Sequence, residues 1–347
     1  MAKLLSIFIF LTILMSEVHK FLFDGLPVRG TLVRLTDSWQ EILQRRAANS
    51  TTGAYPAPVS HMLGELTAAA VLMQSSIKFN GSLTLQIAGT TGSGPVKLVV
   101  AEVQPDLSFR STATVIGDVS SDSNLSHMVN VDNKGRCAVI LDPKDKFPGQ
   151  QPYQGVVPLF DDHRQPIEKL SSVIEHYMLQ SEQLDTTMVL AANDTVAAGL
   201  LIQRLPLQGE GNLAGSMVSK RNEDEIGLNE HYNRLAVFAA SLKQEELLTL
   251  DANEILHRLF WEEAVIRYEP LPAKFACNCS RERVSNMILN LGQTEVAEIL
   301  AERGDVEVSC EFCGQQQRFD PVDAAQIFID SAKKASFNPS GESGLVQ

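Results

Sequence analysis

The sequence predicts an α+β fold: an N-terminal sheet-and-helix core domain, a helical linker and a small C-terminal four-cysteine module. Three observations predict it. Alternating apolar segments are mixed with helical patterns up to residue 206, helical spacing returns near residue 235, and four of the five cysteines lie between residues 277 and 313. Strands and helices that follow no regular repeat favour an α+β domain, in which both are needed to close one core.

The core domain is expected over residues 16–206. Trp39, Ile42 and Leu43 at helical spacing after Asp37 predict a helix at 37–46. A segment rich in Ala, Leu and Met predicts a second helix at 59–74. Two runs that alternate apolar and polar residues, 83–87 and 96–100, flank a Gly-rich turn and predict a hairpin-like pair of strands. A further helix is expected at 167–180, and further strands at 111–116, 136–141, 153–159, 186–191 and 197–203.

Residues 207–272 are expected to form a linker. The stretch up to about residue 230 is polar and Gly-rich, which is typical of a surface loop. Apolar residues then recur at helical spacing and predict packed helices, through Leu235, Phe238 and Leu242 and then Leu256, Leu259 and Phe260.

Bulk composition restricts the function. The chain has 347 residues, 44% of them hydrophobic, and a formal charge of −13. An acidic surface argues against a general nucleic-acid binder, because phosphate contacts require basic residues. Five cysteines in a long chain do not resemble a secreted disulfide framework, so a reducing cytoplasm is expected.

The first residues form a separate N-terminal apolar extension, residues 1–15. Lys3 and the apolar run 4–14 resemble the start of a signal peptide, but no small-residue cleavage site follows. The run is too short to span a bilayer comfortably, so no membrane association is expected. Translation from Met15 explains the extension more simply, as a start-site artefact.

The four clustered cysteines predict a metal site. Cys277 and Cys279 form one close pair, and Cys310 and Cys313 form a second about thirty residues later. Zinc favours four sulfur ligands in a tetrahedron, and a close pair lets one short segment supply two of them. We therefore expect one Zn²⁺ on these four residues, in a zinc module covering residues 273–330, followed by a polar tail at 331–347. Two disulfides are the rival interpretation, either instead of the metal or as a second state of the same site.

The fifth cysteine is expected to be inert. Cys137 lies inside the apolar stretch 135–140 and is predicted to be a buried thiol.

Two other functions are compatible with a four-cysteine module. A zinc ribbon that binds nucleic acid is disfavoured by the acidity of the chain. A thiol-disulfide oxidoreductase using Cys310 and Cys313 is disfavoured because no thioredoxin-like βαβ pattern precedes the pair. A catalytic zinc also keeps an open ligand position, whereas four cysteines fill the tetrahedron. No enzymatic activity is expected.

Short motifs in order along the chain are more specific than the cysteine pattern. The stretches Cys277–Arg283, Val306–Gly314 and Tyr177–Leu184, supported by Phe21–Phe23 and Val28–Gly30, resemble the redox-regulated 33 kDa chaperonin (heat-shock protein 33) family of holdase chaperones. The resemblance covers residues 17 to about 330. It departs at Gln315–Gln317, where the family often has Asn and an aromatic residue, and we expect this departure not to touch a metal ligand.

The resemblance implies a mechanism. It implies an ATP-independent chaperone that is inactive when reduced and zinc-bound. Oxidation then forms disulfides within 277/279 and 310/313, releases zinc and loosens the module and the metastable linker. Exposed apolar residues would bind unfolded or oxidatively damaged client proteins, and the oxidised form would be a homodimer. The expected client-binding residues are Leu235, Phe238, Leu242, Leu256, Leu259 and Phe260.

Two arginines follow the first cysteine pair, and their role stays open between two interpretations. Arg281 and Arg283 either lower the thiol pKa or orient neighbouring groups, or they lie on a solvated helix face, which we favour.

Overall fold

The computed structural model describes residues 15–49, 52–89, 94–206 and 228–336. The chain divides into two compact units, Met1–Ala276 and Cys277–Gln347, and each is described by itself. Residues 1–14 of the predicted apolar extension 1–15 lie outside the described residues, and so does the loop expected up to about residue 230, except for its last few positions. Within the described part of the chain, no helix has the length and apolar character needed to cross a membrane.

The first unit is built on two sheets with helices packed against them, which confirms the predicted α+β class; sheet A is antiparallel, and sheet B is antiparallel except for the parallel pair β12 and β5. In the described residues, sheet A has the order β10-β1-β2-β9-β8, with β11 also on β1, and sheet B has the order β12-β5-β4-β3-β6-β7. The strands of sheet A are β1 (Glu17–Phe23), β2 (Val28–Leu35), β8 (Thr186–Ala192), β9 (Ala197–Arg204), β10 (Val265–Arg267) and β11 (Leu271–Pro272). Those of sheet B are β3 (Gly81–Ala88), β4 (Val96–Val103), β5 (Ser108–Val115), β6 (Arg136–Pro143), β7 (Tyr153–Pro158) and β12 (Lys274–Phe275).

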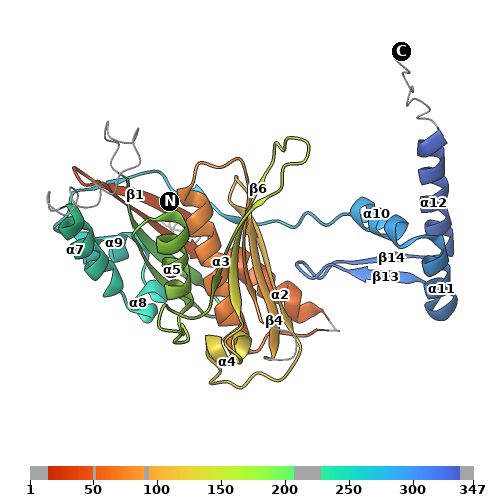
Figure 1. Ribbon diagram of the computed structural model, residues 1–347, viewed down its shortest axis with the longest axis horizontal. Coiled ribbons are helices and arrows are strands. Elements are labelled where there is room, and N and C mark those ends of the chain that lie inside the picture. Colours follow the sequence, from red (N-terminus) through yellow and green to blue (C-terminus); the bar gives the residue numbers. More distant parts are fainter. Residues whose placement is uncertain (1–14, 50–51, 90–93, 207–227, 337–347) are drawn as a thin grey trace, which may run out of the picture. The chain divides into compact units, whose positions relative to one another are not determined.

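One helix fills the space between the sheets. Helix α3 (Ala57–Ser76) begins after Pro56, contacts strands of both sheets and is buried over most of its length (Figure 1). The shorter helices of this core are α2 (Asp37–Ala48), α4 (Leu125–Val129) and α5 (Leu170–Glu182). The predicted helices 37–46, 59–74 and 167–180 correspond to α2, α3 and α5. The predicted hairpin is the antiparallel pair β3 and β4.

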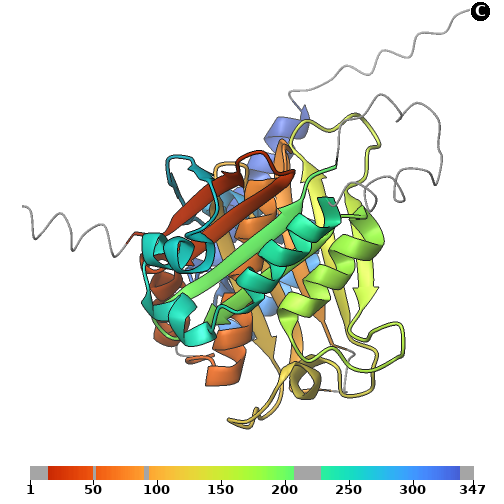
Figure 2. The same cartoon turned by 90° about the vertical axis from the view of Figure 1, so that its left-hand side faces the viewer.

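Three helices cover the opposite face of sheet A. They are α7 (Leu228–Ala240), α8 (Gln244–Thr249) and α9 (Ala252–Phe260), and Figure 2 shows them lying over the strands of this sheet. Helix α9 begins with a capping box between Asp251 and Glu254, which satisfies backbone donors of its first turn. A second apolar cluster fills this interface, with Phe21, Phe23 and Leu32 from the sheet.

The second unit is small. Helices α10 (Arg281–Leu291), α11 (Gln293–Arg303) and α12 (Pro321–Ser336) accompany a two-stranded antiparallel sheet, β13 (Val306–Ser309) and β14 (Gln316–Phe319). Helix α12 continues past residue 330, into the segment expected to be a tail. The buried core of this unit in the described residues consists of Ile288, Val296, Val306, Phe319 and Ala324.

Candidate metal centre

Local backbone structure presents the two cysteine pairs. Cys277 and Cys279 lie in the extended segment before α10, whose N-cap Ser280 accepts a hydrogen bond from the Arg283 backbone N–H at 3.2 Å. Cys310 and Cys313 lie in the turn between β13 and β14. This turn closes through two backbone hydrogen bonds, Gly314 N to Cys310 O at 2.8 Å and Cys310 N to Gln315 O at 2.9 Å. Gly314 has a φ of 68°, which a glycine adopts without strain.

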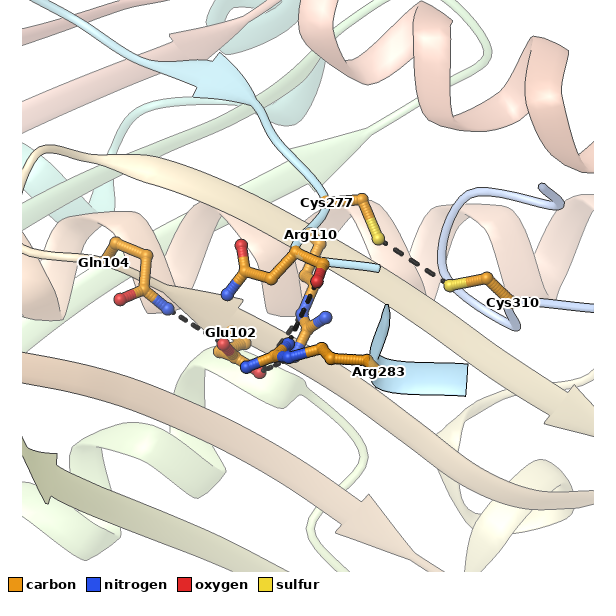
Figure 3. A network of polar contacts seen from close by, with 7 residues as sticks. Glu102, Gln104, Arg110, Cys277, Arg283 and Cys310 are labelled. Carbon is orange, nitrogen blue, oxygen red and sulfur yellow. Dashed lines mark hydrogen bonds and ion pairs between the residues drawn. The ribbon is translucent and has the colours of Figure 1, made fainter. Parts of the chain in front are cut away.

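The four sulfurs come together. All four Sγ atoms lie within 4.8 Å of one another, and in the described residues no other group of three or more metal-ligating side chains meets this condition. Figure 3 shows Cys277 and Cys310 pointing toward each other, with their sulfurs 3.6 Å apart. The sulfurs of Cys279 and Cys313 are 3.2 Å apart.

These distances fit a metal site better than disulfides. A disulfide holds its sulfurs about 2.05 Å apart, and all five cysteines are free. A tetrahedral ion with ligand bonds of about 2.3 Å separates its sulfurs by about 3.8 Å. The arrangement therefore leaves room for one ion among four ligands.

The electrostatics of the cluster also favour a cation. Burial raises the pKa of Cys279, and the neighbouring sulfurs of Cys313 and Cys277 raise it further. Burial also raises the pKa of Cys313. At Cys277 burial is outweighed by hydrogen bonds from Cys279, Cys310 and Cys313, which hold its pKa below the ordinary value. Four adjacent thiols cannot all ionise against one another, so the all-thiolate state requires a positive ion.

Comparisons with known proteins agree with this geometry. The family model described as Hsp33 protein matches residues 16–320. The 33 kDa chaperonin of Chromobacterium violaceum is 44% identical over 314 residues, covering 90% of this chain and 94% of that protein. The chain belongs to the Hsp33 family. The 33 kDa chaperonin of Methylobacillus flagellatus is 38% identical, with the same coverage of both chains.

A solved structure shares the fold. The crystal structure of the 33 kDa chaperonin from Thermotoga maritima has a TM-score of 0.70 and 20% identity, covering 92% of this chain and 99% of that one. The curated relatives are named chaperonins, and membership of the family supports a chaperone role for this chain. The predicted family and fold class are confirmed.

One expectation about the departure from the Hsp33 family pattern is wrong. Gln315 was expected not to touch a ligand, but its Oε1 lies 3.4 Å from the Sγ of Cys279, and its backbone oxygen accepts the Cys310 N–H. The tight turn after Cys313 explains this, because it folds residue 315 back over the sulfurs. Turn geometry is not visible in the spacing of the cysteines alone.

The two arginines have different surroundings. The Arg281 guanidinium donates to Asp323 at 2.7 Å and to the Arg318 carbonyl at 2.9 Å, and it lies over the Phe319 ring at 4.1 Å. Arg281 thus connects the segment after the first cysteine pair to β14 and α12. Arg283 donates to the carbonyl of Asn278, the residue between Cys277 and Cys279, at 3.1 Å.

Cys137 is fully buried in the first unit, as the sequence predicted. Burial raises the pKa of its thiol to about 12, so the reactive thiolate is scarcely populated near neutral pH.

The six expected client-binding residues lie in the interface between α7–α9 and sheet A. Phe238 and Leu259 are partly buried against this cluster. The Phe260 ring meets Phe23 edge-on, with centroids 5.0 Å apart. The buried members are Leu235, Leu242, Leu256 and Phe260.

Motifs upstream of the cysteines that carried the resemblance meet in the core of the first unit. The Tyr177 hydroxyl donates a hydrogen bond to the Glu182 carboxylate at 2.8 Å. The Tyr177 ring packs against Gly155 of β7 so closely that a Cβ at residue 155 would lie 2.6 Å from the ring. Arg29 donates to Gln203 at 3.0 Å. These motifs therefore specify packing of the core and not the metal centre.

Proposed function

We propose that this protein is a redox-regulated, ATP-independent holdase chaperone, inactive while reduced and zinc-bound and active after oxidation. The observation that carries the proposal is four free sulfurs within 4.8 Å of one another in a chain of the Hsp33 family. Four sulfur ligands complete the tetrahedral coordination of an ion and leave no position for a substrate, which supports a structural metal over a catalytic one.

Zinc is the ion whose preferences these ligands match. Cys277, Cys279, Cys310 and Cys313 would hold it, and the ion would keep their sulfurs as thiolates. A single apolar core in so small a unit contributes about 3–5 kcal/mol to the free energy of folding, and the buried core here has five side chains. Structural zinc contributes on the order of 10 kcal/mol to the same free energy, so the apolar core alone would not keep the unit folded after zinc is lost.

Oxidation would exchange this ion for disulfides. The four thiolates give up four electrons to two molecules of hydrogen peroxide, which take four protons from solvent and become four water molecules. Two disulfides form and Zn²⁺ is released. The sulfur contacts of 3.6 Å for 277/310 and 3.2 Å for 279/313 join the two segments, so proximity does not argue for disulfides within each close pair. The family resemblance supports 277/279 and 310/313, pairs that close only very short loops and leave the two segments untied.

The client surface would be the interface that α7–α9 now close. Departure of these helices would uncover the apolar face of sheet A as well as the helices' own apolar side chains. Phe21, Phe23 and Leu32 would then be added to the six residues expected from the sequence. Contiguous exposed apolar surface of this kind binds non-native proteins. A homodimer of the oxidised form and a cytoplasmic location belong to the same proposal.

Light scattering of a thermally unfolding client tests the proposal. We expect the reduced, zinc-loaded protein to leave aggregation unchanged and the peroxide-treated protein to suppress it, with a chelating dye reporting the released zinc. Reduction followed by zinc addition should remove the activity. Equal activity of the reduced and oxidised proteins would contradict redox regulation.

Peptide mapping of the peroxide-treated protein tests the pairing. Disulfides 277/279 and 310/313 are expected, and a dominant 277/310 or 279/313 disulfide would contradict the local pairing.

A further inference from the structure

One segment closes the whole outer edge of β1. We call residues 264–273 the strap. Its strands β10 and β11 pair with the two ends of β1 in antiparallel register. Three further backbone hydrogen bonds complete the edge: Asp24 N to Ala264 O at 2.8 Å, Tyr268 N to Lys20 O at 3.0 Å and Ala273 N to Ser16 O at 3.0 Å.

The strap leads directly to the metal centre along the chain. After it, β12 pairs in parallel with β5, and the Ala276 N–H donates to the Phe109 carbonyl at 2.9 Å. The next residue is Cys277, the first of the four clustered cysteines. A single run of residues 264–276 thus closes edge strands of both sheets and ends at a candidate metal ligand.

The strap is held mainly by its backbone. The side chains of Ile266, Tyr268 and Leu271 are exposed, and Pro270 and Pro272 have no N–H to donate. Its side-chain ties are few: Val265 packs against the cluster under α7–α9, Ala273 is buried, and Arg267 donates to Asn253 at 2.6 Å.

The strand beneath the strap is different. Val18, Phe21 and Phe23 of β1 are buried in the two apolar clusters, so the strand stays in place when its edge is opened. An ordered strand with an unpaired edge is a template for another extended chain.

We propose that the edge of β1 vacated by the strap binds an extended apolar segment of a non-native protein as an added antiparallel strand. This rests on the proposed function, because the strap is freed when the module that follows it loosens. Backbone hydrogen bonds along the edge do not depend on the amino-acid sequence of the added segment. The adjacent Phe21 and Phe23, uncovered when α9 departs, favour apolar side chains on the segment's inner face.

The Asp24 amide reports the state of this edge, since its N–H is donated to Ala264 of the strap. Hydrogen exchange of this amide is measured in the full-length protein. It is expected to be slow when reduced, fast after peroxide treatment, and slow again when a carboxymethylated, permanently unfolded protein is added.

A matched pair of peptides tests the backbone recognition. One has the sequence of residues 264–272, and the other carries an N-methyl group on the residue matching Tyr268, whose N–H donates to Lys20. The side chains are the same. The plain peptide is expected to protect the Asp24 amide of the oxidised protein, and the methylated peptide to bind about tenfold more weakly.

The outcomes separate this inference from the proposed function. Persistent protection of Asp24 after oxidation, or equal binding of the two peptides, overturns the edge site even if aggregation is suppressed. Binding of the plain peptide without suppression of aggregation supports the edge site and contradicts the holdase function. Protection of Asp24 in oxidised protein without added peptide, with a doubled mass, overturns the inference in favour of a second copy of this chain.

Discussion

The Phe260→Ala substitution tests the proposed client surface without any change at the cysteines. The Phe260 side chain is 2% exposed and contacts the rings of Phe21 and Phe23. Truncating a buried Phe to Ala costs about 3–5 kcal/mol. If the cost falls on the docking of α7–α9, the undocked fraction rises by roughly a hundredfold to several thousandfold, since about 1.4 kcal/mol is tenfold.

Two measurements on the reduced, zinc-loaded variant give the result. Hydrogen exchange over α7–α9 reports undocking, and light scattering of an unfolding client reports chaperone activity. We expect faster exchange and partial suppression of aggregation without any oxidant. Trp261→Ala is the matched control, because Trp261 is the next residue and 68% exposed, and exposed substitutions usually change stability by only about 0.5 kcal/mol.

If Phe260→Ala opens the helices and the reduced protein still leaves client aggregation unchanged, the covered face of sheet A is not the client surface.

Three further predictions concern other residues. Arg281→Ala loses the contacts to Asp323 and Phe319 and should destabilise the second unit by about 1 kcal/mol in thermal melting, more than the control Arg283→Ala; equal effects would contradict a tie through Arg281. Cys137→Ala should leave peroxide activation unchanged, and its loss would place the redox site elsewhere. Burial, with Arg267 and Arg34, lowers the pKa of His19 from 6.5 to about 4. The unfolded chain therefore binds more protons between these values, so stability is lost as pH falls from about 6.5 toward 4. In denaturant melts, His19→Gln should make the free energy of unfolding depend less on pH in this range. An unchanged pH dependence would mean that other groups cause it.

The sequence predicted the elements whose periodicity is simple. Strands β3 and β4 alternate because sheet B buries only one of their faces, and α2 follows helical spacing. Helix α3 is buried on nearly every side, so its richness in Ala, Leu and Met predicted it instead. Strands β1 and β2 were not predicted, because their apolar residues do not alternate regularly with polar ones: His19 and Lys20 interrupt β1, and β2 is buried at four successive positions from Gly30 to Val33. The strap was missed for a different reason: its strands are two or three residues long and lie among prolines.

The candidate site was predictable because its ligands are few, rare and closely spaced. Cys277, Cys279, Cys310 and Cys313 do meet at metal-binding distance. What surrounds them was not predictable, since the contacts of Arg281 and Gln315 depend on how a turn and a helix fold back in space. Helical spacing predicted the helices of residues 228–260 but could not say that their apolar residues cover sheet A.

A peroxide titration of one sample, with zinc release, thiol count and client aggregation read at every point, tests whether oxidation of the cluster activates the chaperone. We expect all three to change together and to be complete when two molecules of peroxide have been consumed per chain. One zinc would be released, and one buried thiol, that of Cys137, would remain. Complete zinc release and oxidation of the four clustered cysteines, with the client still aggregating as it does in buffer, would contradict the account.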